Sequence, residues 1–283
     1  MRYDLHTHST ASDGTLTPGG LVERARAQGI DVLALTDHDT LAGIPEARLA
    51  ARRCGLALVP GVEISVTWGG MTVHIVGVNV DIAHPPLLEG LTRLCEFRGW
   101  RAGEIGRRLE HKAGIAGAWA GACHHARGGL VSRTHFARFL VEQGQARDMQ
   151  DAFVRFLKRG KPGYVAGQWA SLEEAVGWIS GAGGQAIVAH PARYDMTATK
   201  LRMLLGEFKE CGGEAMEVIS GSHASHEYPV LAAQAEKSRL LSSAGSDYHG
   251  PENPWIDLGR LPPLPKACVP IWHDWELPRA AGQ

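Results

Sequence analysis

The chain begins its first predicted strand with YDLHTH, residues 3–8. Apolar and polar side chains alternate here with the period of two that is typical of a β-strand. Leu5 therefore faces one side of the strand, whereas His6 and His8 face the other. Two imidazoles on one face of one strand can reach a shared cation. This stretch thus predicts both the first strand of a sheet and a candidate metal-binding site.

Further apolar stretches have the length and composition of strands. They are residues 32–36, 57–59, 73–80, 186–189, 215–219 and 240–244. Helical patterns lie between most of them, and they cover residues 17–29, 47–54, 172–180, 201–211 and 228–239. Strands that alternate with helices predict right-handed crossovers and a parallel sheet. The predicted fold class is therefore α/β, with a TIM-like barrel that is closed or nearly closed.

The middle of the chain differs from the rest in charge and pattern. Residues 95–165 carry 13 Lys and Arg against 6 Asp and Glu, a net charge of +7, whereas the remainder carries −8. Helical patterns separated by glycine-rich turns cover residues 95–113, 134–142 and 148–157. We predict a small helical cap domain at 95–165, inserted into a barrel domain of residues 1–94 and 166–283. A basic cap suits an anionic ligand, and the alternative is an arginine-rich solvated surface.

The composition of the 283 residues narrows the class of protein. Hydrophobic residues make up 44% and charged residues 21%, as in soluble globular chains. No apolar run reaches the roughly 18–20 residues of a membrane span. Five cysteines without a CxxC pair argue against a zinc ribbon and a disulfide framework. We therefore expect a cytoplasmic protein with no membrane partner and no obligate protein partner, and an extended, proline-rich tail from Pro251.

Histidines and carboxylates recur at the ends of the predicted strands. They are His6, His8, Asp13, Asp37, His38, Asp39, Glu63, His74, His190, Asp247 and His249. In a parallel barrel the carboxyl ends of the strands open on one face, so these side chains converge there. Such a cluster suits Zn²⁺, Mn²⁺ or Fe²⁺. Singly, His74 fits a structural histidine and residues 37–39 fit a turn, but together the residues predict a metal centre.

Six segments carry a family resemblance. They are HTHSTASDG (6–14), ALTDHDT (34–40), GVEIS (61–65), His74, VAHPAR (188–193) and SAGSDYHG (243–250), which resemble the ordered motifs of the polymerase and histidinol phosphatase (PHP) family. The resemblance implies a distorted (β/α)7 barrel with two or three divalent ions, Mn²⁺ first and Zn²⁺ or Fe²⁺ as alternatives. Its implied ligand sets are His6, His8, Glu63 and Asp247 for one ion, Asp13, His38 and His249 for a second, and Glu63, His74 and His190 for a third.

Neighbouring divalent ions suit phosphoester hydrolysis, because they lower the pKa of a shared water and clamp phosphoryl oxygens. We therefore expect a hydroxide activated by the ions to attack phosphorus. Asp13, His38 and His249 are the candidates for protonating the leaving group, and the sequence leaves open which of them does so. Asp39 and Asp4 are expected to orient histidine rings.

Within the predicted cap, the segment SRTHFAR (132–138) is the clearest candidate for binding a substrate. Ser132 is expected to cap a helix, which leaves free N–H groups and Arg133 aimed at an anion. Thr134, His135 and Phe136 are further candidates for holding a substrate. The alternative is an ordinary capped helix with Phe136 in its core. Weaker basic candidates are Arg193 and the segment RGKPGY (159–164).

The barrel motifs and the cap segment together resemble those of bacterial 3′,5′-nucleoside bisphosphate phosphatases within the PHP family. This resemblance implies hydrolysis of the 3′-phosphate of adenosine 3′,5′-bisphosphate, which leaves AMP. It implies that Arg133, Thr134, His135 and Phe136 hold the nucleotide. The alternatives are a 5′-to-3′ exonuclease on short 5′-phosphorylated RNA or DNA, a histidinol-phosphate phosphatase, and a non-catalytic PHP binding module. The expected partners are thus a small nucleotide and short RNA oligonucleotides.

Overall fold

Seven strands form a sheet in the computed structural model of this chain, which describes residues 1–253 and 255–276. The strands follow one another in the sheet in their order along the chain. They are β1 (Tyr3–Asp4), β2 (Val32–Leu35), β3 (Ala57–Trp68), β4 (Met71–Val78), β5 (Gln185–Val188), β6 (Ala215–Ser220) and β7 (Leu241–Gly245). The arrangement confirms the α/β class and the distorted barrel predicted from the sequence.

The sheet curves until its first and last strands meet. The regular part of β1 ends at Asp4, well before the predicted end at His8, but the chain continues beside β7. Leu5 N donates to Ala244 O at 3.0 Å. Farther on, Thr7 forms a parallel bridge with Tyr248. These contacts nearly close the barrel and lay the HTH segment along the end of β7.

One strand runs against the others, which corrects the prediction of an all-parallel sheet. β4 is antiparallel to both β3 and β5. The cause is a two-residue turn, Gly69-Gly70, in which both residues have positive φ (53° and 75°). Such a turn favours a hairpin whose twist matches that of its strands. β3 therefore extends over 12 residues instead of the predicted three.

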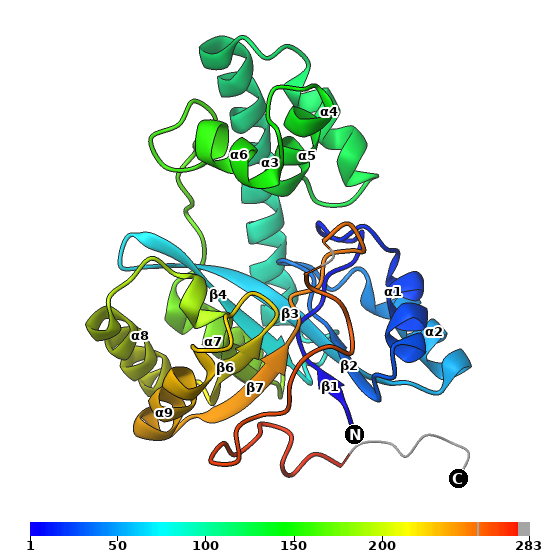
Figure 1. Cartoon of the computed structure of the whole chain (residues 1–283), viewed down its shortest axis with the longest axis vertical. Coiled ribbons are helices and arrows are strands. Elements are labelled where there is room, and N and C mark those ends of the chain that lie inside the picture. Colours follow the sequence, from blue (N-terminus) through cyan, green and yellow to red (C-terminus); the bar gives the residue numbers. More distant parts are fainter. Residues whose placement is uncertain (254, 277–283) are drawn as a thin grey trace.

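Helices cover the outer face of the sheet and form a layer above it (Figure 1). Those that pack around the sheet are α1 (Pro18–Ala27), α2 (Ile44–Cys54), α7 (Leu172–Gly181), α8 (Ala198–Glu210), α9 (Tyr228–Ser238) and the 3-10 turn η2 (Pro191–Arg193). Those of the upper layer, which we call the cap, are α4 (Ala118–Ala126), α5 (Arg133–Glu142), α6 (Met149–Ala152) and the π-helical turn η1 (Phe153–Leu157), with the end of α3 (Pro85–Ala113). Residues 114–117 form a turn after α3, but α4 then occupies part of the stretch between residues 113 and 134 for which only glycine-rich turns were predicted.

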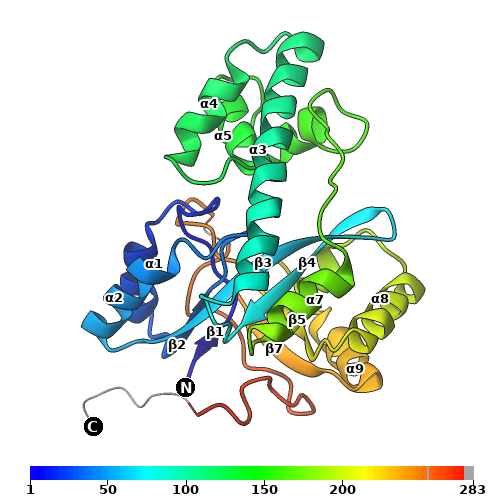
Figure 2. The ribbon, with the colours of Figure 1, turned by 180° about the vertical axis from the view of Figure 1, so that it is seen from behind.

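The long helix α3 joins the sheet to the cap, as Figure 2 shows from behind. It starts at Pro85, a favoured first helical residue, and not at residue 95 as predicted. Its first turns pack Leu87 and Leu91 into the core of the barrel. Its last turns pack Ile105 and Leu109 into a separate apolar cluster with the cap helices. The two clusters support our division into a barrel and an inserted cap, which remains a proposal.

The remaining predictions concern membrane-spanning helices, the cysteines and the C-terminal tail. Among the described residues, no helix is both long and apolar enough to cross a membrane. All five cysteines are free thiols. From residue 251 to residue 276, the described part of the tail has no regular strand or helix, and a single bridge joins Pro270 to Ser242 of β7. Pro278, the last proline of the predicted extended tail, lies outside the described residues.

Candidate metal centre

All nine predicted ligands gather at one end of the barrel, on the side that faces the cap. Their ligand atoms form four overlapping groups, within each of which all atoms lie within 4.8 Å of one another. The groups are His6, His8 and Asp247; His6, Glu63 and His190; His38, Glu63 and His74; and His8, Asp13, His38 and His249. The predicted convergence thus occurs, although Glu63 lies within β3 and His74 within β4 instead of beyond the end of a strand.

Two carboxylate oxygens lie close to the ring nitrogens of His6 and His8 in the most buried part of the cluster, and we call these four atoms the cage. Glu63 Oε2 lies 3.3 Å from both His6 Nε2 and His8 Nε2. Asp247 Oδ1 lies 3.6 Å from His6 Nε2 and 3.3 Å from His8 Nε2. Ligand atoms placed tetrahedrally around an ion at the usual 2.0–2.2 Å are about 3.4 Å apart. The four separations between these carboxylate oxygens and ring nitrogens therefore match those between ligands of a divalent ion.

The remaining predicted ligands flank this cage on two sides. The second oxygen of Glu63, Oε1, lies 2.8 Å from His74 Nδ1 and 3.1 Å from His190 Nε2. On the other side, Asp13 Oδ1 lies 3.2 Å from His249 Nε2 and 3.8 Å from His38 Nε2.

His38 joins the two sides, because its other nitrogen, Nδ1, lies 2.8 Å from Glu63 Oε2. The implied ligand sets assigned His38 to the ion of Asp13, whereas the geometry also places it beside Glu63. The assignment of each ligand to one ion remains our proposal.

Several of these atoms are buried without a hydrogen-bond partner among the described residues. They are His6 Nε2, His8 Nε2, Asp13 Oδ1, His38 Nδ1 and Glu63 Oε2. Polar atoms buried in this way cost free energy unless another group binds them. Imidazole nitrogens and carboxylate oxygens are the ligands of Zn²⁺, Mn²⁺ and Fe²⁺. The buried clusters therefore fit several divalent ions.

Burial and neighbouring charges shift the pKa values of the donors in different directions. Burial, with help from the neighbouring His249 and His38, lowers the pKa of His8 to about 3, so its imidazole is neutral at pH 7. A neutral imidazole is the form that binds a metal. Burial opposes charge on His249, but the carboxylate of Asp13 outweighs it and raises the pKa of His249 to about 9. The carboxyl group of Glu63 is buried too, yet the surrounding histidines hold its pKa well below the ordinary value, so it is ionised.

Three non-glycine residues of the site adopt positive φ angles: Asp39 (52°), His190 (27°) and Asp247 (56°). This conformation costs roughly 1–2 kcal/mol for residues with a side chain. Each residue donates its backbone N–H to another group of the site. Asp39 donates to Glu63 O at 2.9 Å, and Asp247 donates to His6 O at 2.8 Å. His190 donates to a carboxylate oxygen of Glu217 at 2.6 Å. The backbone strain at these residues therefore lies within the centre and fixes where its ligands point.

Glu217, which the sequence did not single out, supports two predicted ligands. It lies in β6 with its side chain 1% exposed. Besides accepting the His190 N–H, its Oε1 lies 2.7 Å from His6 Nδ1, which directs His6 Nε2 into the cage. A carboxylate on the second nitrogen of a ligating histidine fixes the ring and raises its basicity. A lone acidic residue in the apolar stretch AMEVIS was the available signal.

We expect Glu217→Gln to weaken Mn²⁺ binding by about 10- to 100-fold, because the neutral amide holds His6 and His190 less firmly. Titration of the metal-depleted protein with Mn²⁺ measures this directly. Glu214→Gln is the matched control, since Glu214 precedes the same strand and accepts from Gln185 Nε2. Wild-type Mn²⁺ affinity in Glu217→Gln would contradict this role.

The carboxylates predicted to orient histidine rings do something else. Asp39 accepts from Arg98 Nε at 2.5 Å and from Ser65 N at 2.7 Å, so it anchors α3 to β3. Asp4 accepts from Ser246 N at 2.8 Å and holds the backbone after β7. Asp39 therefore binds an arginine and a backbone N–H instead of a histidine ring, and that prediction was wrong.

Asp37, by contrast, organises the loop that carries Asp13. It accepts from the hydroxyl groups of Ser9 and Ser12 at 2.7 and 2.6 Å. It also accepts from Ser9 N at 2.8 Å. A turn over residues 37–39 and a metal centre are therefore compatible, because Asp37 holds the loop that carries Asp13.

The predicted substrate segment begins α5. Ser132 caps this helix as expected, since its Oγ accepts from Thr134 N at 3.1 Å. Arg133 is half-buried, with its guanidinium 5.8 Å from the centre of the Phe153 ring. His135 is buried, and its Nδ1 accepts from Ser132 N at 3.0 Å, which completes a capping box. Phe136 is fully buried in the core of the cap. Arg133 and Thr134 are thus the more accessible of the four candidate substrate residues.

Arg101 of α3 adds positive charge near Arg133, whereas Arg98 is paired with Asp39. Arg101 donates to the carbonyl of Val165 and not to a carboxylate. Burial, together with the neighbouring Arg133 and Arg98, lowers the pKa of Arg101 to about 9. An anion between the cap and the barrel would relieve this repulsion. The weaker candidate Arg193 lies on the barrel side, where it pairs with Asp247 at 2.5 Å.

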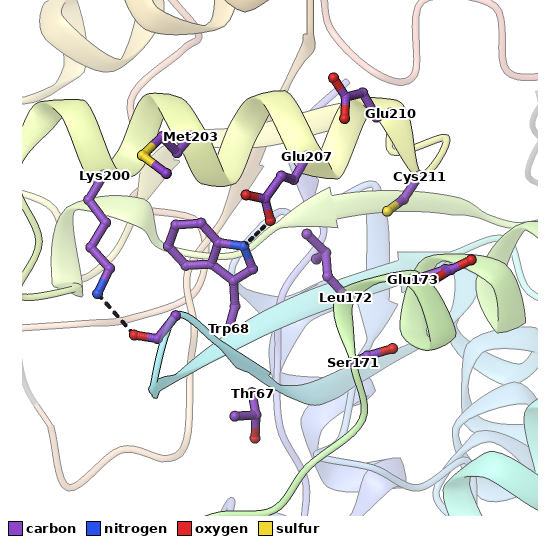
Figure 3. Close-up of a pocket in the computed structure, with 11 residues that line it drawn as sticks. Thr67, Trp68, Ser171, Leu172, Glu173, Lys200, Met203, Glu207, Glu210 and Cys211 are labelled. Carbon is purple, nitrogen blue, oxygen red and sulfur yellow. Dashed lines mark hydrogen bonds between the residues drawn. The ribbon is translucent and has the colours of Figure 1, made fainter.

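A cavity of about 920 Å³ lies elsewhere, between the β3–β4 hairpin and the helices α7 and α8 (Figure 3). Trp68 Nε1 donates to Glu207 at 2.5 Å, and Lys200 donates to the carbonyl of Gly69 at 3.1 Å. These contacts anchor the hairpin to α8. No predicted ligand lines this cavity, so it is separate from the metal centre.

Comparisons with known proteins agree with the geometry. The family model of the PHP domain matches residues 4–107. A 3′,5′-nucleoside bisphosphate phosphatase of Chromobacterium violaceum is 49% identical over 276 residues, which cover 96% of each chain. The 5′-3′ exoribonuclease Rnm of Escherichia coli is 50% identical over 279 residues, which cover 98% of this chain and 94% of that protein.

A solved structure has the same fold. An amidohydrolase from Chromobacterium violaceum with bound sulfate superimposes with a TM-score of 0.95 at 48% identity, over 99% of both chains. The sequence motifs, the seven-stranded barrel and the buried His/Asp/Glu clusters therefore have one common explanation. This chain belongs to the PHP-domain family and is a phosphoesterase of that family.

Proposed function

We propose that this phosphoesterase removes the 3′-phosphate of nucleoside 3′,5′-bisphosphates and converts adenosine 3′,5′-bisphosphate into AMP and phosphate. One observation carries the proposal: α5, which begins with Arg133, lies against the His/Asp/Glu centre, since Ser132 Oγ donates to Asp13 Oδ2 at 3.1 Å. Such an arrangement suits a substrate with two phosphates, one for the centre and one for the cap. The name of the Chromobacterium violaceum relative supports the same substrate class.

The centre would hold two or three divalent ions, with Mn²⁺ as the proposed metal and Zn²⁺ or Fe²⁺ as alternatives. His6, His8, Glu63 and Asp247 would hold one ion, Asp13, His38 and His249 a second, and Glu63, His74 and His190 a third. When bound, divalent ions lower the pKa of water and neutralise charge on phosphoryl oxygens. The chain contributes the fixed ligand positions, which the buried network around Glu217 and Asp37 maintains.

Hydrolysis breaks the bond between phosphorus and the ribose 3′-oxygen, and that oxygen must gain a proton. Asp13, His38 and His249 are the proposed catalytic residues for this transfer. The side chains of His38 and His249 are 13% and 29% exposed, whereas those of His6 and His8 are fully buried. A group that meets the substrate must be accessible to it. The substrate would therefore approach the centre from the side of His38 and His249.

The 5′-phosphate would bind at the start of α5. Arg133 would form charge-assisted hydrogen bonds to the phosphate, and Thr134 would offer its hydroxyl. The positive end of the helix dipole adds to this attraction. His135 and Phe136, which the sequence also suggested as substrate residues, would act from within the cap by holding α5 in place.

A second candidate function is 5′-to-3′ exonuclease activity on short 5′-phosphorylated RNA. The observation that favours it is the 50% identity to the exoribonuclease Rnm of Escherichia coli. The same centre and the same 5′-phosphate site would serve both reactions. The two functions differ in the substrate beyond the scissile phosphate, since RNA carries a further nucleotide there and a bisphosphate ends at that phosphate.

A parallel assay of phosphate and nucleotide release tests the proposal. The Mn²⁺-loaded protein is given adenosine 3′,5′-bisphosphate, AMP, histidinol phosphate or a 5′-phosphorylated RNA tetramer. We expect rapid phosphate release from the bisphosphate, with AMP and histidinol phosphate untouched. Rapid shortening of the tetramer with little bisphosphate turnover would establish the exonuclease instead. Preferred hydrolysis of histidinol phosphate would refute both candidates.

A further inference from the structure

The cap touches the metal centre through the loop that carries Asp13. At the end of α4, Gly129 comes so close to this loop that an added Cβ would lie 2.3 Å from the carbonyl oxygen of Thr10. The next residue, Leu130, directs its N–H toward the carbonyl of Ala11 at 3.5 Å. Glycine allows this approach because it has no side chain. The cap is therefore seated directly on the loop between β1 and α1.

Two side chains of the cap then reach Asp13 itself. Ser132 Oγ donates to Asp13 Oδ2 at 3.1 Å. Arg138, one and a half turns farther along α5, donates from Nη2 to the backbone carbonyl of Asp13 at 2.9 Å. Neither bond uses Asp13 Oδ1, which faces His249 Nε2 at 3.2 Å. The cap thus holds one oxygen and the backbone of Asp13 while the other oxygen points into the centre.

We propose that Ser132 and Arg138 are positioning residues for Asp13, so that α5 completes the metal centre. A ligating carboxylate keeps its direction when its second oxygen is hydrogen-bonded. The inference rests on the proposed ligand role of Asp13. It goes further in assigning the cap a part in metal binding as well as in substrate choice.

The arrangement also links the two proposed binding sites. Ser132 immediately precedes Arg133 and Thr134, the proposed 5′-phosphate contacts, and its hydroxyl bonds both Thr134 N and Asp13. A shift of α5 therefore changes both sites together. Because such coupling is reciprocal, an ion held by Asp13 favours the α5 position that binds phosphate, and bound phosphate favours the ion.

Ser171 provides a matched control for Ser132. It caps α7 with the same capping-box geometry, accepting from Glu174 N at 3.1 Å. Its bonds stay within α7 and reach none of the proposed ligands. Loss of either hydroxyl removes one helix cap of equal kind. Only loss of the Ser132 hydroxyl also removes a contact with Asp13.

Titration of the metal-depleted full chain with Mn²⁺, without substrate, tests the inference. Free Mn²⁺ is followed by electron paramagnetic resonance, which yields the number of sites and their affinities. We expect Ser132→Ala and Arg138→Met each to weaken one Mn²⁺ site by about 10- to 100-fold. Ser132→Thr, which keeps a hydroxyl, retains an affinity close to that of the wild type. Ser171→Ala binds Mn²⁺ as the wild type does.

Three outcomes would overturn the inference. They are wild-type Mn²⁺ affinity in both Ser132→Ala and Arg138→Met, failure of Ser132→Thr to restore binding, and an equal loss in Ser171→Ala, which would reveal a general effect of helix capping. The titration contains no nucleotide, so it does not depend on which substrate the enzyme prefers. A protein that fails to hydrolyse the bisphosphate would refute the proposed function and leave this result standing.

Discussion

Glu63→Gln is expected to lower kcat/KM for the phosphorylated substrate by about 1,000-fold or more, above the 10- to 100-fold typical of residues that merely support a ligand. Among the described residues, Glu63 is the carboxylate that faces both sides of the centre. Its Oε2 belongs to the buried cage with His6 and His8, and its Oε1 lies beside His74 and His190. Glutamine preserves the shape but removes the charge that the proposed neighbouring cations would share. We expect elemental analysis to show a loss of bound metal that parallels the loss of turnover.

Glu207→Gln is the control for this substitution. Glu207 accepts from Trp68 Nε1 beside the separate cavity, so its replacement changes a carboxylate without touching the centre. It should retain full metal content and turnover. Circular dichroism of both variants checks that the barrel is intact. A Glu63→Gln enzyme with wild-type metal content and wild-type turnover would contradict the central place of Glu63.

Arg133→Ala is expected to raise KM for adenosine 3′,5′-bisphosphate by about 10- to 100-fold, the worth of a charge-assisted hydrogen bond of about 1.5–3 kcal/mol. For adenosine 3′-monophosphate, which has no 5′-phosphate, KM should barely change. The difference arises because Arg133 begins α5 at the proposed 5′-phosphate site, whereas the 3′-phosphate would lie at the metal centre. Steady-state kinetics with the two substrates measures it.

Arg155→Ala is the matched control for Arg133→Ala. Arg155 belongs to the same cap and also lies over an aromatic ring, that of Phe156 at 4.8 Å, but its side chain is 51% exposed. Its loss should leave both KM values unchanged. If Arg133→Ala raised KM equally for both substrates, Arg133 would not recognise the 5′-phosphate. In that case, the positive charge of Arg133 and Arg101 would have a role other than binding the 5′-phosphate.

Much of the fold could be predicted because strand patterns and helix caps are local features. The resemblance to the PHP family and the α/β barrel were confirmed, and Ser132 caps the N-terminus of α5 as predicted. The direction of β4 was missed because apolar strands look alike whichever way they run. The pair Gly69-Gly70 contained the information, since two adjacent glycines between strands favour a hairpin. The start of α3 was missed too, although Pro85 is a typical first residue of a helix.

The candidate site was predictable for a different reason. Strand ends meet in any barrel, so the residues that follow each strand could be expected to converge. Contacts between distant segments follow no such rule. Glu217 beside His6 and Ser132 beside Asp13 join residues 211 and 119 positions apart, and no local pattern announces either pair. The burial of Phe136 likewise depends on how the cap helices pack against one another.

The proposed reaction is tested most directly by following adenosine 3′,5′-bisphosphate with ³¹P nuclear magnetic resonance, in ¹⁸O-enriched water and with the Mn²⁺-loaded enzyme. We expect the 3′-phosphate signal to disappear while the 5′-phosphate signal persists as that of AMP. The released phosphate should carry ¹⁸O, because water attacks phosphorus and the ribose keeps its oxygen. Accumulation of adenosine 3′-monophosphate, or release of phosphate without ¹⁸O, would contradict the proposed reaction.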